Sequence, residues 1–149
     1  MRVCLKGLSL AGVIVALAGA PVAASASESP HQTAKRLLAK CYHAVSIVPV
    51  RAVKLNTPDV ARMNRKAVHA NNVCKASKRL SDIADAHPKD KALTTAQGAY
   101  FLLAIGIRDY VQYLVAAALL RADRTDLIRA VRETTSGKRL AAHALRELS

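Results

Sequence analysis

Two cysteines and two histidines are the first residues of this 149-residue chain that could do chemistry together. Cys41 and Cys74 could form a disulfide, or they could bind zinc with His43 and His69, since thiolates and imidazoles are preferred zinc ligands. The spacings C-x-H and H-x4-C match no common zinc module. We therefore predict one disulfide between Cys41 and Cys74, worth about 3 to 4 kcal/mol, and no metal site.

A second candidate is a polar cluster, Arg108 and Asp109 with Gln112 and Tyr113 one turn later, inside an otherwise apolar stretch. A buried charge needs a partner, and adjacent helical residues point about 100° apart, so this pair is not an ideal ion pair by itself. One interpretation is a structural pair that other helices satisfy. The other is a ligand pocket in which Arg108 holds an anionic ligand and Asp109 orients it or acts as a base.

A third candidate is a group of basic residues suited to binding anions. Arg62, Arg65, Lys66 and His69 recur at three- and four-residue spacing, so their side chains project together from a helix. The whole predicted binding set lies within residues 54–79 and consists of Lys54, Arg62, Arg65, Lys66, His69, Lys75, Lys78 and Arg79. No aromatic residues interleave with them, which argues against base stacking on single-stranded nucleic acid, whereas contact with phosphate or carboxylate groups fits.

The chain as a whole is strongly basic, with a formal net charge of +13, and the charge is lopsided. Residues 31–81 hold eleven Lys or Arg and one acidic residue, Asp59, whereas residues 82–149 hold ten basic and eight acidic residues. A high net charge can be explained by solubility alone. Its uneven distribution, however, favours an anionic partner: envelope lipid at a membrane surface, cell-wall polymer or an acidic protein. The sequence does not set the oligomeric state.

The first 26 residues have the features of a secretory signal peptide. Basic residues precede an apolar run at 8–18, and Ala24-Ser25-Ala26 provides a small-x-small cleavage pattern. The run is shorter than the roughly 20 residues needed to cross a bilayer. We predict a cleaved signal peptide at 1–26 and a single helical domain at 27–149. The protein is expected in a periplasmic or extracellular space, where disulfides persist and intracellular nucleic acid is not met.

The spacing of the apolar residues predicts helices throughout the mature chain, with no strand-like alternation. The expected helices are, in chain order, about 30–48, 58–86, 89–122, a short one after Asp123 and a final one after Gly137. Because the apolar face of the second rotates near Asn71-Asn72, we expect it to bend there; the alternative is that its C-terminal end is packed between two neighbours. Residues 134–137 are expected to break the last segment in two.

The expected helix at 89–122 is apolar on nearly every face, which is typical of the centre of a bundle or of a membrane span. Arg108 and Asp109 lie in the middle of it, and each would cost about 2.5 to 3.5 kcal/mol at a bilayer centre. We therefore predict a buried central helix. The fold class is all-α: a compact four- to five-helix bundle around one long apolar central helix, with one disulfide.

Motifs of common enzymes are missing: there is no G-x-S-x-G, Walker loop, dinucleotide glycine pattern or H-E-x-x-H. The sequence thus indicates a non-enzymatic exported binding protein, without a cofactor, that engages an anionic partner through residues 54–79. One alternative is an inhibitor or immunity-type protein that caps a secreted enzyme through apolar anchors. The other is a small helical enzyme or ligand carrier built around Arg108 and Asp109.

Overall fold

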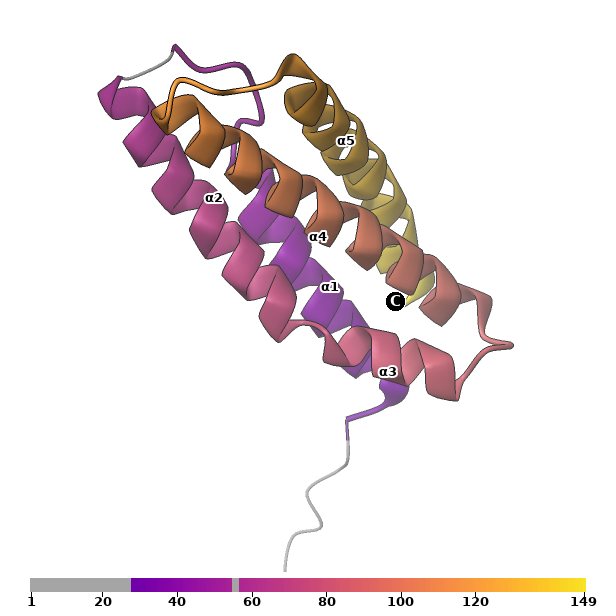
Figure 1. Cartoon of the computed structure of the whole chain (residues 1–149). Coiled ribbons are helices and arrows are strands. Elements are labelled where there is room, and N and C mark those ends of the chain that lie inside the picture. Colours follow the sequence, from indigo (N-terminus) through magenta and orange to yellow (C-terminus); the bar gives the residue numbers. More distant parts are fainter. Residues whose placement is uncertain (1–27, 55–56) are drawn as a thin grey trace, which may run out of the picture.

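The computed structural model describes residues 28–54 and 57–149, so the predicted signal peptide at 1–26 lies outside the described residues. The described residues contain no strand and form five helices (Figure 1): α1 (Pro30–Ser46), α2 (Pro58–Ala76), α3 (Arg79–Ala86), α4 (Lys91–Ala118) and α5 (Arg124–Glu147). The predicted all-α bundle with one long apolar helix and a Cys41–Cys74 disulfide is confirmed.

Local sequence determines where α1 begins. The Ser29 hydroxyl accepts a hydrogen bond from the Gln32 backbone N–H, and the Gln32 side chain accepts one from the Ser29 N–H, which together form a capping box. Pro30 occupies the first turn, where its missing N–H has no cost. The side chains that α1 buries are Thr33, Ala34, Leu37, Leu38, Cys41, Ala44 and Val45.

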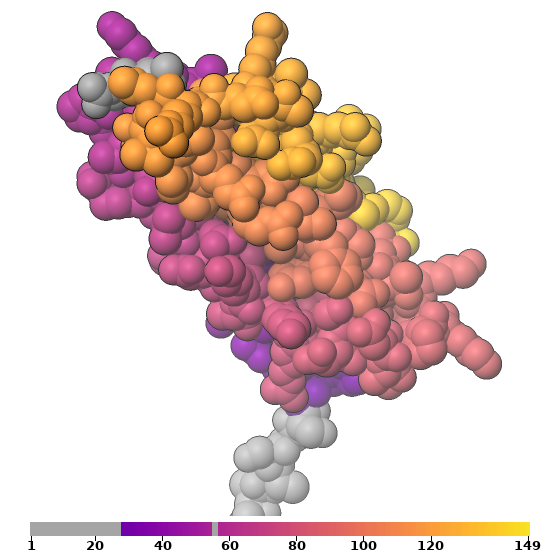
Figure 2. All heavy atoms as spheres, viewed as in Figure 1, coloured from indigo at the N-terminus to yellow at the C-terminus, as the bar shows by residue number. Residues whose placement is uncertain are grey.

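The central helix is α4, which contacts each of the other four helices. By length and composition alone it could cross a membrane, but core helices of bundles pass the same test. Figure 2 shows that α4 still forms the middle of one face, between α2 and α5. Its exposed apolar side chains include Phe101, Ile105 and Val115. The helix is therefore central as predicted, but its predicted burial holds for only part of its surface.

The backbones of α4 and α5 approach closely at two glycines. A Cβ on Gly106 would lie 2.7 Å from the backbone nitrogen of Thr134, and a Cβ on Gly137 would lie 2.8 Å from the backbone nitrogen of Leu103. The predicted break at 134–137 is wrong, since α5 is continuous there. Gly137 serves the contact with α4 rather than ending the helix, and the Thr134 hydroxyl donates to the Ala130 carbonyl one turn earlier.

The bend in the second helical segment lies at residues 77–78 and not at Asn71-Asn72 as predicted. The Ser77 N–H donates to the Cys74 carbonyl and the Leu80 N–H donates to the Ser77 carbonyl, so the backbone makes a 3₁₀ turn. With three residues per turn instead of 3.6, Cys74, Ser77 and Leu80 stay on one side, and all three are buried. The 3₁₀ turn thus keeps the apolar residues on both sides of it facing the core, although the sequence indicates that the apolar face rotates.

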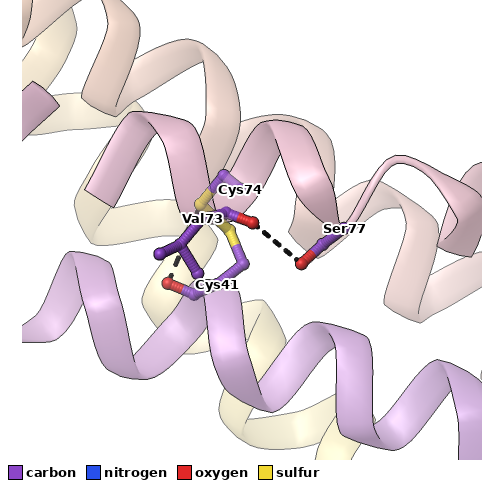
Figure 3. Close-up of a disulfide and its surroundings, with 4 residues drawn as sticks. All are labelled: Cys41, Val73, Cys74 and Ser77. Carbon is purple, nitrogen blue, oxygen red and sulfur yellow. Dashed lines mark hydrogen bonds between the residues drawn. A yellow bond between two sulfur atoms is a disulfide. The ribbon is translucent and has the colours of Figure 1, made fainter. Parts of the chain in front are cut away.

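The disulfide joins α1 to α2 inside the bundle, with the Cα atoms of Cys41 and Cys74 4.6 Å apart (Figure 3). Next to it, the Ser77 hydroxyl donates to the Val73 carbonyl. Cys41 lies five residues before the end of α1, but Cys74 lies sixteen residues after the start of α2. The start of α2 therefore extends roughly 16 Å beyond the end of α1, at about 1.5 Å per residue.

Two tyrosines of α4 hold the connection that covers this offset. The Tyr110 hydroxyl accepts a hydrogen bond from the Arg51 N–H, and the carbonyl oxygens of Pro49 and Arg51 lie 3.2 and 3.0 Å away as its acceptors. The Tyr113 hydroxyl accepts from the Val53 N–H. Burial raises the pKa of Tyr110 above the ordinary value of 10.0, at which the hydroxyl is already protonated at neutral pH. Buried tyrosines thus position the chain that leads into α2.

Replacing Gly137 by Ala is expected to lower the free energy of unfolding by about 2 to 3 kcal/mol, because the new Cβ would overlap the α4 backbone. Gly98→Ala is the matched control, since its Cβ would only touch Leu140 Cδ2 at 3.5 Å. The control should be neutral or stabilise by up to about 1 kcal/mol through helix propensity. Denaturant unfolding of both variants checks this, and equal effects would contradict the close approach of α4 to α5.

Candidate functional site

The candidate anion-binding surface is the outer face of α2, which we call the basic ridge and define as Arg62, Arg65, Lys66 and His69. All four side chains are exposed. The opposite face of α2 is buried through Val60, Met63, Ala67, Ala70 and Cys74. Burial of that apolar stripe, together with the disulfide at its end, leaves the ridge as the face that α2 turns to solvent.

The positive charge of the ridge is largely uncompensated. Asp59 pairs with Arg62 and, at 3.7 Å, with Arg51; the hydrogen bond from Arg62 is the main cause that lowers the pKa of this carboxyl. Arg65, Lys66 and His69 have no ion-pair partner among the described residues. All ten acidic residues of the chain lie within the described part, so the charge is not balanced elsewhere.

The other predicted anion-binding residues extend the ridge rather than closing a cleft around it. Lys54 precedes α2, Lys75 lies in its last turn, and Lys78 and Arg79 lie at the turn into α3. All four are exposed. The set therefore follows a rod of about 28 Å, the length of a 19-residue helix, which suits an extended anionic partner better than a small ligand.

The polar cluster of α4 is an ion-pair network. The Asp109 side chain is 2 % exposed; its Oδ2 accepts from Arg129 Nε at 2.6 Å and its Oδ1 accepts from Arg108 at 3.3 Å. Arg108 is 57 % exposed, and Gln112 is also exposed. Tyr113 lines an apolar groove that does not include the other three residues. These contacts favour the structural interpretation, with Arg129 of α5 as the partner that the buried carboxylate requires.

Cys41, Cys74, His43 and His69 do not assemble a metal site. Both sulfurs belong to the disulfide, and His43 and His69 are exposed. In the part of the chain that the structure describes, no group of three or more His, Cys, Asp or Glu side chains is placed to hold a metal ion.

A basic face on α5 escaped the sequence reasoning. Arg124, Arg132, Arg139 and Arg146 recur every seven or eight residues, and all four are exposed. They were missed because the net charge of residues 82–149 is small: the acidic residues of this segment nearly balance its basic residues. Helical periodicity could have separated them, since the acidic residues of α5 lie about 100° or more from the centre of this face.

An apolar groove of about 780 Å³ adjoins this face at the start of α5. It is lined by Ala52, Val53, Tyr113, Ala122, Arg124, Leu127, Ile128, Val131 and Arg132. The charged residues in this lining are both arginines, so the groove combines an apolar floor with positive charge.

Together, the fold and its surfaces define a small all-α bundle with one disulfide and basic outer helices. No protein-family model matches the chain, and neither a curated protein nor a solved structure is similar enough to count as a match. Any functional conclusion therefore depends on the contacts and charges described above.

Removing Arg129 should destabilise the protein more than removing Arg108. Arg129→Gln leaves one oxygen of the buried Asp109 carboxylate without its close donor, at a cost of about 2 kcal/mol. Arg108→Gln removes two longer hydrogen bonds of an exposed side chain and should cost less than about 1 kcal/mol. Denaturant unfolding measures both. A larger loss for Arg108→Gln would show that Arg108, and not Arg129, is the main partner of Asp109.

The hydrogen-bonded carboxylate of Asp90 makes the stability depend on acid pH. His31 Nε2 lies 2.6 Å from Asp90 Oδ2, and Asp90 also caps α4 by accepting from the Leu93 N–H. The hydrogen bond to His31, followed by that from Leu93, lowers the pKa of Asp90 below its ordinary value of 3.8. This carboxylate therefore stabilises the fold above pH 3.8, and the contribution is lost as pH falls through the lower folded-state pKa.

Asp90→Asn keeps a capping side chain but removes the titrating charge. We expect the urea midpoint of this variant to fall less between about pH 5 and about pH 2.5 than that of the unchanged protein. Urea titrations across this range test the expectation. An identical acid-side decline in both proteins would assign the pH dependence to other carboxylates.

Proposed function

We propose that this protein is a non-enzymatic, exported helical binding protein that engages an anionic partner through the basic ridge of α2. The observation that carries the proposal is the exposed and unpaired charge of Arg65 and Lys66, in a segment, residues 31–81, whose single acidic residue, Asp59, is already paired. Each contact between one of these side chains and a phosphate or carboxylate group contributes to the binding free energy, and the resulting affinity falls as the salt concentration rises.

The support of α2 suits this role. The disulfide ties its last turn to α1, and Tyr110 and Tyr113 hold the chain that leads to its first turn. A ridge held at both ends loses little further conformational freedom when it binds, and this lowers the cost of association. The disulfide is also consistent with an oxidising compartment outside the cytoplasm. Export agrees with anionic lipids, cell-wall polymers and acidic proteins as the candidate partners.

An inhibitor-type protein that caps a secreted enzyme is the second candidate function. The observation in its favour is the exposed apolar side chains Phe101, Ile105 and Val115 on α4, since apolar anchors carry most of the energy in such complexes. The third hypothesis, a ligand carrier at Arg108 and Asp109, loses support because both side chains are already paired: the buried Asp109 carboxylate accepts from Arg108 and from Arg129.

Retention of the oxidised protein on an anionic matrix across a salt series tests the basic ridge. The ridge variant is Arg65→Gln with Lys66→Gln, which leaves the Asp59–Arg62 pair intact. Its control is Lys89→Gln with Lys91→Gln, which removes the same charge from exposed residues next to α4. We expect the ridge variant to lower the slope of log affinity against log salt by about 1 to 2, and the control to change it much less.

Equal losses in the two variants would mean that retention reflects net charge alone and would refute a localised site on α2. A partner protein that binds one-to-one, with little dependence on salt or on the ridge variant, would instead favour the capping function.

A further inference from the structure

The turn between α4 and α5 contains a leucine in a conformation that favours glycine. After α4, the Arg121 N–H donates to the Ala116 carbonyl at 2.8 Å and the Leu120 N–H donates to the Ala117 carbonyl at 3.2 Å. These two bonds form a Schellman motif, in which the residue at the place of Leu120 has a left-handed backbone and is usually glycine. Leu120 has φ 58°, and it is the one non-glycine residue with positive φ in the described chain.

The same turn exposes two large apolar side chains, Leu119 and Leu120, and Ile128 is exposed in the second turn of α5. They are 63 %, 61 % and 57 % exposed, which makes them the three most exposed of the large hydrophobic residues described. We call these three residues the apolar tip. Both the backbone of Leu120 and the exposure of its side chain are unfavourable for the isolated protein. Folding stability therefore does not explain a leucine here, and strain that persists in this way points to a function.

Exposed arginines accompany the apolar tip. Arg121 directly follows Leu120 in the chain, and Arg124 and Arg132 line the same apolar groove as Ile128. The acidic residues nearby are occupied: the Asp123 carboxylate accepts from the Thr125 N–H as the cap of α5, and Asp126 pairs with Arg129. Exposed apolar side chains accompanied by arginines complement a surface with anionic head groups above hydrocarbon.

The position of the apolar tip allows such a contact. Figure 1 shows the α4–α5 turn at one end of the elongated bundle, so the tip can meet a flat surface while the helices extend away from it. We propose that the apolar tip docks the protein on an anionic phospholipid bilayer, with Leu119 and Leu120 entering the interface and the arginines contacting lipid phosphates. The proposal does not depend on the basic ridge of α2, because it uses different residues.

Partitioning of the oxidised protein onto vesicles tests the proposal. The vesicles contain either equal parts of phosphatidylglycerol and phosphatidylcholine or phosphatidylcholine alone. The tip variant is Leu119→Ala with Leu120→Gly, in which the glycine relieves the strained backbone, so the fold should be at least as stable. The control is Phe101→Ala with Ile105→Ala, which removes exposed apolar side chains from the middle of α4. The ridge variant Arg65→Gln with Lys66→Gln runs beside them.

We expect the unchanged protein to bind the anionic vesicles and to bind phosphatidylcholine much more weakly. The tip variant should bind anionic vesicles about tenfold less, without loss of thermal stability, while the control stays within about twofold. No binding to anionic vesicles, or equal losses in the tip and control variants, would overturn the proposal. Binding that falls only in the ridge variant would also overturn it, and would leave the function proposed for α2 in place.

Discussion

The close contact of α4 with α5 is the constraint on which the rest of the structure depends. Gly106 and Gly137 let the two backbones approach to distances that a Cβ on either residue would prevent. The Asp109–Arg129 ion pair crosses the same interface, so its 2.6 Å geometry requires that approach. The tight turn that contains Leu120 joins α4 to α5 at one end of this interface. The packing of the core, the ion pair of the buried Asp109 and the position of the apolar tip thus all depend on how α4 and α5 pack together.

The features predicted correctly from the sequence are those that neighbouring residues determine. The capping box of Ser29 and Gln32, the apolar stripe of α1 and the disulfide between Cys41 and Cys74 all follow from the sequence pattern. The two wrong predictions, for the bend between α2 and α3 and for a break within α5, concern features that neighbouring residues do not determine. Thr134 to Gly137 resemble a helix break locally, but a contact with Leu103 more than thirty residues away decides their conformation.

The candidate surfaces also differ in how far the sequence predicts them. The basic ridge could be predicted because its residues recur on one helix face next to a single acidic residue. For Asp109 the sequence showed that a buried carboxylate needs a partner, but not that Arg129, twenty residues further on, supplies it. The apolar tip could not be recognised beforehand, since Leu119 and Leu120 continue an apolar helix in the sequence. Only the end of α4 and the backbone of Leu120 show that they face solvent.

The two proposed surfaces differ in the physical range over which they act. The uncompensated charge of α2 acts over about a Debye length, roughly 8 Å at physiological salt, and so favours encounter with an anionic partner before contact. Leucine side chains act only once they are buried and therefore affect how long a complex lasts. In Figure 1 the start of α2 lies at the same end of the bundle as the α4–α5 turn. One anionic surface could thus be attracted by the ridge and held by the tip, because the offset between α1 and α2 carries the first turn of α2 to that end.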